Sequence, residues 1–342
     1  MEFEIGIGVG TRDYDSLRVK AAIADEGQLS FLSIGDNPGN LKETYVSLTV
    51  LASASTRIRV GTSVTNPSFR DPLVVASALS SIESIAPGRV FLGISSGRAR
   101  KGSSVEDLRD HVTAIKALWR DGHTEHRGER LELNWDAKPV PVIIAGSGPK
   151  SLALAGELGD GAMIEAGVRP ENIEWARGHI DAGAKAAGRR VDDLDLWWYL
   201  KSSIGETHEE ALGYASAQLA SAGAHVLGHI PHARGVPEHL QAGCRDLHAR
   251  YDMATHVSTG GDDPNRRLLE DPVLRDYLLD RFGLVGTKQG WIDRIKELQA
   301  RGVQRIFCAA VVPNLDDLIR VAGTDVLTAV RAGRTAVRDP TG

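Results

Sequence analysis

Short apolar segments of strand length recur along this chain, and most are followed by a stretch with helical periodicity. Strands joined through helices pair in parallel, and segments that are apolar on both faces are typical of parallel sheets covered by helices. Eight such repeats predict a closed (β/α)8 barrel, the TIM-barrel fold. A doubly wound open sheet is the alternative. The eight segments are residues 3–9, 29–34, 58–64, 90–94, 140–145, 162–164, 194–200 and 303–309.

The stretches between these segments carry helix signals. Ser104 precedes an amphipathic stretch and has Asp107 three residues later, which predicts a capped helix start. Thr287 is expected to begin the last helix before the eighth strand, and Gly302 to end it in a left-handed conformation.

The alternation fails once, over residues 228–282, where prolines, histidines and charges collect. We interpret this stretch as an insertion after the seventh strand. Barrel enzymes build their sites on the rim where such a segment would lie, so a lid that gates the substrate is expected. No repeat or linker divides the rest of the chain, and residues 1–342 are predicted to form a single domain.

Composition excludes several classes of protein. The chain has 40 basic and 45 acidic residues and a formal charge of −5, which does not suit a nucleic-acid clamp. It has two cysteines without a CxxC pair and no HExxH motif, so neither a disulfide framework nor a metal site is expected. The N-terminus lacks a secretory signal and no run of about 18 apolar residues occurs, so we expect a cytoplasmic protein without membrane partners.

Four motifs follow one another in a recognisable order. They are RVGTSVTNPSFRDP at 59–72, GRVFLGISSGR at 88–98, AGSGP at 145–149 and LVGT at 284–287. In this set the chain resembles the bacterial luciferase-like flavin and deazaflavin oxidoreductases. The resemblance implies a TIM barrel that binds a tricyclic redox cofactor at the carboxyl ends of its strands. It favours coenzyme F420, and FMN is the alternative.

The resemblance also implies particular contacts with the cofactor. Ser63 and Val64 map to a non-prolyl cis peptide that supports the central ring in relatives. Ser95, Ser96 and Gly97 end the fourth strand with hydroxyl and amide donors for a ring carbonyl or a tail hydroxyl. The same resemblance implies that Asp36 lies against the deazaflavin and that Asn66 and Glu165 contact the cofactor.

Gly146, Ser147 and Gly148 stand directly before Pro149, at a helix start. Free backbone amides and the positive end of a helix dipole meet there, and two glycines allow close approach of a ligand. The resemblance assigns this turn to the phosphate-bearing tail of the cofactor. A turn that merely joins strand and helix is the alternative.

Two positions depart from the sugar-phosphate dehydrogenases among these relatives. Arg98 stands where those enzymes use a glutamate, and Asn37 stands where they use a catalytic histidine. An arginine stays protonated and an asparagine moves no proton near neutral pH, so glucose-6-phosphate oxidation is not expected. Arg98 either pairs with an anion of the substrate or cofactor or forms a surface ion pair. His256 is the candidate replacement for the missing acid or base, and a surface histidine is the alternative.

We therefore expect an F420-dependent oxidoreductase that moves a hydride between C5 of the deazaflavin and a small organic substrate. The predicted catalytic set is Asp36, Asn37, Arg98 and His256. An FMN-dependent monooxygenase and a non-catalytic flavin-binding protein are the alternatives. A barrel hydrolase would need a metal or a carboxylate pair at the rim, and Asp36 and Glu165 are the only candidates. A homodimer is expected.

Overall fold

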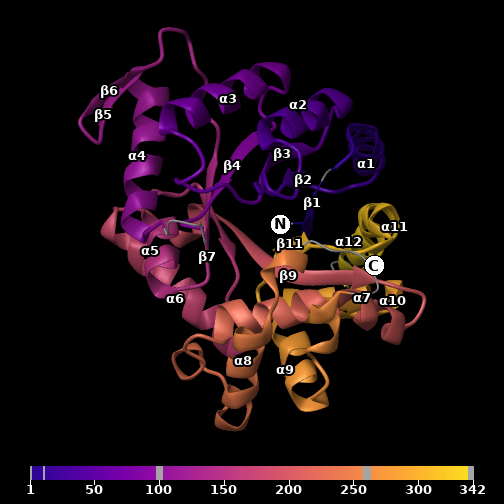
Figure 1. The fold of residues 1–342 in the computed structure, drawn as a ribbon. Coiled ribbons are helices and arrows are strands. Elements are labelled where there is room, and N and C mark those ends of the chain that lie inside the picture. The colour runs from indigo at the N-terminus through magenta and orange to yellow at the C-terminus, as the bar shows by residue number, and fades with distance from the viewer. Residues whose placement is uncertain (1, 11, 98–102, 257–262, 338–342) are drawn as a thin grey trace. The chain divides into compact units, whose positions relative to one another are not determined.

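The computed structural model describes residues 2–10, 12–97, 103–256 and 263–337 of the chain. Its parallel strands follow the order β10-β9-β11-β1-β2-β3-β4-β7-β8, and β9 also pairs with β8 (Figure 1). This closes eight strands into the predicted (β/α)8 barrel, and the doubly wound alternative is excluded. The strands are β1 Glu4–Val9, β2 Phe31–Ile34, β3 Arg59–Thr62, β4 Val90–Ile94, β7 Val142–Gly146, β8 Gly161–Ile164, β9 Asp195–Ile204, β10 Gly283–Gly286 and β11 Arg305–Ala309.

The longer helices alternate with these strands. In chain order they are α1 Tyr14–Glu26, α2 Thr44–Ala54, α3 Pro72–Ile85, α4 Val105–Asp121, α5 Pro149–Leu158, α6 Pro170–Ala186, α7 His208–Ala222, α8 Glu238–Arg250, α9 Pro272–Phe282, α10 Lys288–Ala300, α11 Leu315–Val321 and α12 Leu327–Val337. The predicted capping box of Ser104 and Asp107 begins α4, Thr287 caps α10, and Gly302 has a left-handed φ of 84°. These helix boundaries are therefore confirmed.

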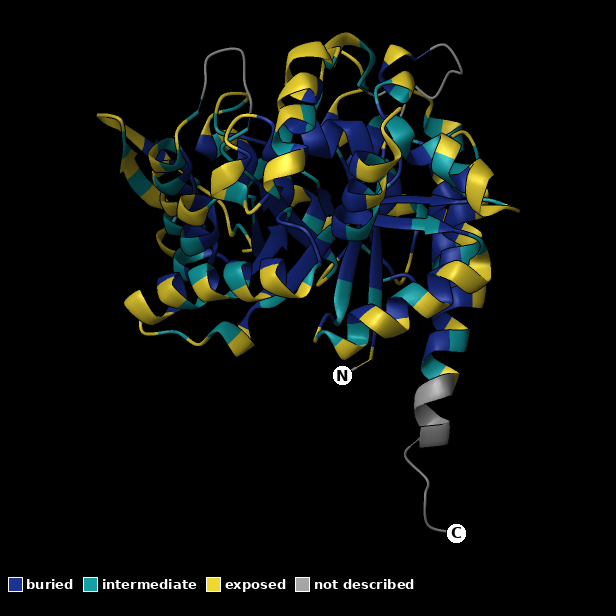
Figure 2. Ribbon diagram, turned by 90° about the horizontal axis from the view of Figure 1, so that it is seen from below, coloured by how far each residue is buried: buried dark blue, intermediate teal, exposed yellow. Residues whose placement is uncertain are grey.

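The chain forms two compact units. The N-terminal unit consists of Gly8–Ile164 and Glu174–Trp197, and the C-terminal unit of Met1–Ile7, Glu165–Ile173 and Trp198–Gly342. The parallel strands of both units are dark blue, or buried, for most of their length in Figure 2. In the N-terminal unit the core includes Phe31, whose ring makes edge contacts with Phe91 at 5.0 Å and with Trp197 at 4.7 Å between centroids.

Two arginines close helix ends at the start of the strands in the N-terminal unit. Arg57 donates to the carbonyl of Ala24 in the last turn of α1 (2.8 Å) and to that of Leu29 between α1 and β2 (3.1 Å). Arg89 donates in the same way to the carbonyls of Ala52 (3.1 Å) and Ser55 (3.0 Å), at the end of α2. The last carbonyls of a helix lack partners within it, so these side chains stabilise the amino-terminal edge of the sheet.

One hairpin stands apart from the barrel strands. β5 (His123–His126) and β6 (Glu129–Glu132) pair antiparallel across Arg127 and Gly128, which have φ values of 51° and 83°. Positive φ at both central residues is the geometry that two-residue hairpins favour, because its twist matches that of the strands.

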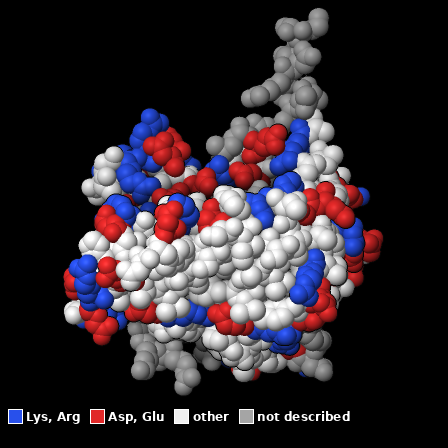
Figure 3. Space-filling model, turned by 90° about the horizontal axis from the view of Figure 1, so that it is seen from above, with Lys and Arg blue, Asp and Glu red and all other residues white. Residues whose placement is uncertain are grey.

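The outer helices differ in charge. α2 has no charged residue and α3 has one, Glu83, whereas α4 carries acidic and basic residues along its length. The large exposed side chains on α2 and α3 are apolar: Val46, Val74 and Ile85 are 49%, 50% and 50% exposed. Figure 3 shows a broad area without Lys, Arg, Asp or Glu on the face where these helices lie.

A ninth parallel strand, β10, was not predicted. The end of β9 pairs with it, from Lys201 with Gly283 to Ile204 with Gly286, while the middle of β9, from Trp198 to Lys201, pairs with β11. The sequence prediction ended this strand at Leu200, and the polar residues Lys201, Ser202 and Ser203 follow. In the structure these residues are buried, and β10 itself contains only two apolar residues between glycines.

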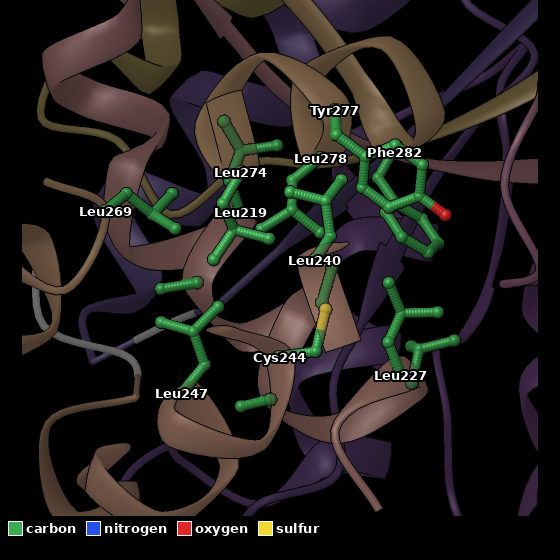
Figure 4. Close-up of a cluster of buried hydrophobic side chains, with 14 of the residues drawn as sticks. Leu219, Leu227, Leu240, Cys244, Leu247, Leu269, Leu274, Tyr277, Leu278 and Phe282 are labelled. Carbon is green, nitrogen blue, oxygen red and sulfur yellow. The ribbon is translucent and has the colours of Figure 1, made fainter. Parts of the chain in front are cut away.

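The stretch 228–282 has no strand among its described residues, as predicted, and contains α8 and α9. These helices pack with α7 around a cluster of buried apolar side chains in the C-terminal unit (Figure 4). Leu219 of α7, Cys244 of α8 and Leu278 of α9 are completely buried there. The insertion is thus anchored by a core of its own rather than built as an open loop.

No helix in the described part of the chain is both long and apolar enough to cross a membrane.

Candidate active site

The carboxyl ends of four strands lie at one edge of the sheet in the N-terminal unit, because β2, β3, β4 and β7 pair in parallel and in register. Most of the residues predicted from the sequence follow these ends. They are Asp36 and Asn37 after β2, Ser63, Val64 and Asn66 after β3, Ser95, Ser96 and Gly97 after β4, and Gly146, Ser147 and Gly148 at the end of β7.

The segment 63–66 is fixed on both sides. The peptide bond between Ser63 and Val64 is cis, as the resemblance implied. On one side the amide of Ser63 donates to the carbonyl of Ile34 on β2 (2.8 Å), and the hydroxyl of Ser33 donates to that of Ser63 (2.8 Å). On the other side the amide of Thr65 donates to the carbonyl of Gly93 on β4 (3.0 Å).

Asn66 and Gly97 bring two of the predicted segments into contact. Asn66 is 7% exposed, and its Oδ1 accepts from the amide of Ser68 at 3.0 Å. Gly97 has a φ of 70°, and a Cβ at this position would lie 2.8 Å from Cβ of Asn66. Glycine is therefore required here, both by the backbone conformation and by close approach.

The turn 146–148 leads directly into α5, with Pro149 as the first helical residue. A Cβ on Gly146 would lie 2.4 Å from Oγ of Ser151, so the turn packs tightly on the helix start. The hydroxyl of Ser151 donates to the carbonyl of Gly148 at 3.0 Å. The first amides of a helix have no carbonyl partner within it and lie at its positive end, which suits a phosphate group.

The carboxylate of Asp36 is enclosed by the chain. Its side chain is 1% exposed and accepts hydrogen bonds from the hydroxyls of Thr44 (3.0 Å) and Thr65 (2.7 Å). The guanidinium of Arg70 forms an ion pair with it. Burial acts to lower the pKa of Arg70, but the hydrogen bond and charge of Asp36 raise it above its ordinary value. The neighbouring Asn37 begins a turn, and its Oδ1 accepts from Nδ2 of Asn40 at 3.3 Å.

Glu165 belongs to the C-terminal unit and follows β8. Its Oε1 accepts from Nζ of Lys201 at 2.8 Å. The side chain of Lys201 is 7% exposed and lies over the ring of Tyr199, 4.3 Å from the centroid. The lysine of this ion pair is buried on β9, one residue beyond Leu200, where the strand was expected to end.

His256 also belongs to the C-terminal unit, within the insertion. Its Nδ1 lies 2.8 Å from the hydroxyl of Tyr251, and its ring makes an edge contact with that of His225, 6.3 Å between centroids. The imidazole is thus oriented by a phenol, an arrangement that suits a group that gives or takes a proton. Arg98, the remaining candidate, lies outside the described residues.

Sequence reasoning missed the partners of these side chains, namely Thr65, Arg70, Lys201 and Tyr251. Two of them had a visible signal. Arg70 is the first charged residue after a run of ten uncharged ones, and Lys201 is the one charge between Leu196 and Gly205. A single charge inside such a run predicts a buried ion pair, because an unpaired buried charge is costly. Within the described ranges, no three His, Cys, Asp or Glu residues are placed to hold a metal ion.

A sequence profile described as luciferase-like monooxygenase matches residues 5–305. Together with the closed barrel and the polar edge at its strand ends, this match defines the chain as an oxidoreductase of the (β/α)8 fold. The chain belongs to the luciferase-like monooxygenase family.

Two curated proteins that are similar to this chain are named as a reductase and a dehydrogenase. The chain is 29% identical to the 5,10-methylenetetrahydromethanopterin reductase of Archaeoglobus fulgidus over 328 residues, 92% of this chain and 95% of that protein. It is 33% identical to the F420-dependent glucose-6-phosphate dehydrogenase of Amycolatopsis mediterranei over 183 residues, 47% of this chain and 55% of that protein.

A solved structure confirms the fold. The coenzyme F420-dependent tetrahydromethanopterin reductase from Methanopyrus kandleri superposes with a TM-score of 0.74 at 20% identity, over 96% of this chain and 99% of that one.

Proposed function

We propose that this chain binds coenzyme F420 at the carboxyl ends of β2, β3, β4 and β7 and transfers a hydride between C5 of the deazaflavin and a small organic substrate. The observation that carries the proposal is the juxtaposition of a fixed segment, 63–66, with the start of α5 on one edge of one sheet. The names of the two curated relatives and of the solved reductase support the choice of reaction class.

The donor set fits such a cofactor. Near the strand ends the chain offers the hydroxyls of Ser63, Ser95 and Ser96, which suit the carbonyl groups of a deazaflavin ring. The start of α5 after Gly148 suits the phosphate of its tail. When bound, the deazaflavin supplies the hydride carrier. The residues of the chain hold the ring and the reacting carbon in a near-attack geometry and exclude water.

Proton transfer needs a group outside the 63–66 segment. Asn37 moves no proton near neutral pH, and Arg98 is an arginine and stays protonated. His256 is the candidate that the sequence offers for this role, and the hydroxyl of Tyr251 orients its ring through the bond at Nδ1. That His256 acts on the substrate stays a prediction. The lid function expected for residues 228–282 stays a prediction.

Titration of the purified apoprotein with F420 and with FMN, followed by fluorescence quenching, tests the choice of cofactor. We expect F420 to bind more tightly. Tighter binding of FMN would replace the proposal with a flavin-dependent monooxygenase, which the family description also fits. Stoichiometric binding of F420 without turnover of any alcohol, aldehyde or pterin donor would indicate a non-catalytic cofactor-binding protein.

We also propose that two copies of the chain pair through α2 and α3. A surface helix normally presents charged residues to water, and these two present Val46, Val74 and Ile85 instead. A face without charge is complementary to a second face without charge, and a twofold axis brings the same face of a second copy against it.

Light scattering after size-exclusion chromatography tests this pairing. We expect a dimer for the wild type and a monomer for Val74→Glu. Val273→Glu is the matched control, because Val273 is 57% exposed but lies on α9. A wild-type monomer, or a Val74→Glu dimer, would refute the pairing.

A further inference from the structure

The carboxylate of Asp36 has no acceptor position left for a ligand. A carboxylate offers about four acceptor positions on its two oxygens. The hydroxyl of Thr44 donates to Oδ1, the hydroxyl of Thr65 donates to Oδ2, and the guanidinium of Arg70 reaches both oxygens. With its side chain 1% exposed, Asp36 is surrounded by these partners rather than open to a cofactor.

These partners come from separate parts of the N-terminal unit. Thr44 is the first residue of α2, Thr65 follows β3, and Arg70 precedes α3. Thr65 is the residue through which Asp36 acts on the cofactor edge, because its amide donates to the carbonyl of Gly93 (3.0 Å) and its carbonyl accepts from the amide of Ser95 (3.0 Å). One side chain therefore ties the segment 63–66 to the end of β2, while its backbone ties it to β4.

Arg70 is held in turn by residues of the α2 region. Its guanidinium donates to Oε1 of Glu43 at 2.7 Å and lies over the ring of Tyr45, 4.8 Å from the centroid. The Arg70 side chain is 16% exposed. Contacts with two carboxylates and one aromatic ring restrict the conformations that the Arg70 side chain can adopt. The position of the guanidinium beside Asp36 therefore depends on the residues at the start of α2.

We propose that Asp36 and Arg70 are positioning residues that hold the segment 63–66 in register for the cofactor ring, and that the carboxylate of Asp36 touches neither cofactor nor substrate and moves no proton. This inference rests on the proposed function, since it assigns a role within the same site. It differs from the role that the family resemblance implied for Asp36, which was direct contact with the deazaflavin.

The test is a double-mutant cycle read out by binding. F420 dissociation constants are measured by fluorescence quenching for the wild type, Asp36→Asn, Arg70→Met and the double variant. If both residues act through one network, each single variant weakens binding by about tenfold and the double variant weakens it no further, because coupled neighbours are non-additive. The pH dependence of F420 binding should be unchanged in Asp36→Asn.

A second pair of variants isolates the hydroxyl of Thr65. Thr65→Val keeps the shape but removes the donor to Asp36 and should weaken F420 binding, whereas Thr65→Ser keeps the hydroxyl and should restore it. Asp25→Asn is the control for general destabilisation. Asp25 accepts from the amides of Thr56 (2.7 Å) and Ile58 (3.0 Å) before β3 begins, so its loss should lower the melting temperature without changing the dissociation constant.

The outcomes separate the two proposals. A wild type that binds neither F420 nor FMN overturns the proposed function and this inference with it. If the wild type binds F420 but Thr65→Val binds it equally well, the inference alone is overturned. The inference alone is also overturned if the losses of F420 affinity in Asp36→Asn and Arg70→Met add in the double variant. A change in the pH dependence of F420 binding in Asp36→Asn would overturn it as well.

Discussion

We expect the buried imidazole of His111 to lower the free energy of unfolding of the protein in acid. It lies on α4, is 3% exposed, and its Nε2 has no hydrogen-bond partner among the described residues. Burial, with a smaller contribution from the charge of His126, lowers the pKa of His111 from 6.5 to about 4. Between these values the unfolded chain binds a proton that the folded chain excludes, so stability is lost as the pH falls from about 6.5 towards 4.

The two pKa values set the size of this loss. Linkage gives about 2 kcal/mol near pH 5 and about 3 kcal/mol near pH 4, relative to neutral pH. His111→Phe removes the titrating group. The variant should therefore lose less free energy of unfolding than the wild type on acidification, by these amounts. Other groups titrate in the same range, so the quantity to compare is the difference between variant and wild type, measured by urea unfolding at several pH values.

An exposed histidine provides the control. His239 lies on α8 and is exposed, so His239→Gln controls for the loss of a histidine side chain outside the core. The reasoning would be refuted if His111→Phe and the wild type lost the same free energy of unfolding between neutral pH and about pH 5.

Three further predictions concern the site and the sheet. Gly148→Glu should abolish tight F420 binding, because it adds an anion where the tail phosphate is proposed to lie at the start of α5, and unchanged affinity would remove that turn from the site. Gly97→Ala should lower the free energy of unfolding by about 1–3 kcal/mol and weaken F420 binding, because its Cβ would clash with Asn66. Gly88→Ala is the control: its φ is also positive, at 73°, but no atom lies within 4 Å of the added Cβ, so it should lower the melting temperature without changing F420 binding. Arg89→Ala should cost about 2 kcal/mol in denaturant unfolding, because helix-end carbonyls lose their donors, and should not change the F420 dissociation constant.

The barrel was predictable because its signal is local. Each strand is a short apolar run, each helix keeps a regular apolar spacing, and caps such as Ser104 with Asp107 mark the boundaries. β10 was missed for the same reason, since four residues with two glycines carry no strand pattern. Its existence depends on β9 continuing through Lys201, where polar residues are buried by pairing rather than by apolar character.

The site was predictable only in part. The residues at strand ends could be located because parallel strands end at one edge, and the cis peptide at Ser63 came from family resemblance rather than from composition. The partners of Asp36 could not, because Arg70 lies 34 residues away and no periodicity links two loops that meet only in the folded chain. Tyr251 and His256 are only five residues apart, but the hydrogen bond between them depends on the local backbone conformation, which no periodicity in this segment reveals.

The division of β9 between two neighbours has a consequence for how this fold diversifies. β11 completes the ring along Trp198–Lys201 of β9, and β10 pairs with Lys201–Ile204 at the end of the same strand. The chain between β9 and β10 therefore returns to a strand that lies outside the ring of eight. We expect this connecting segment to tolerate changes in length and sequence while the eight-stranded scaffold keeps its register. Under the proposed function, we expect a graft of the corresponding segment from another member of the family to change the substrate preference while F420 binding is retained.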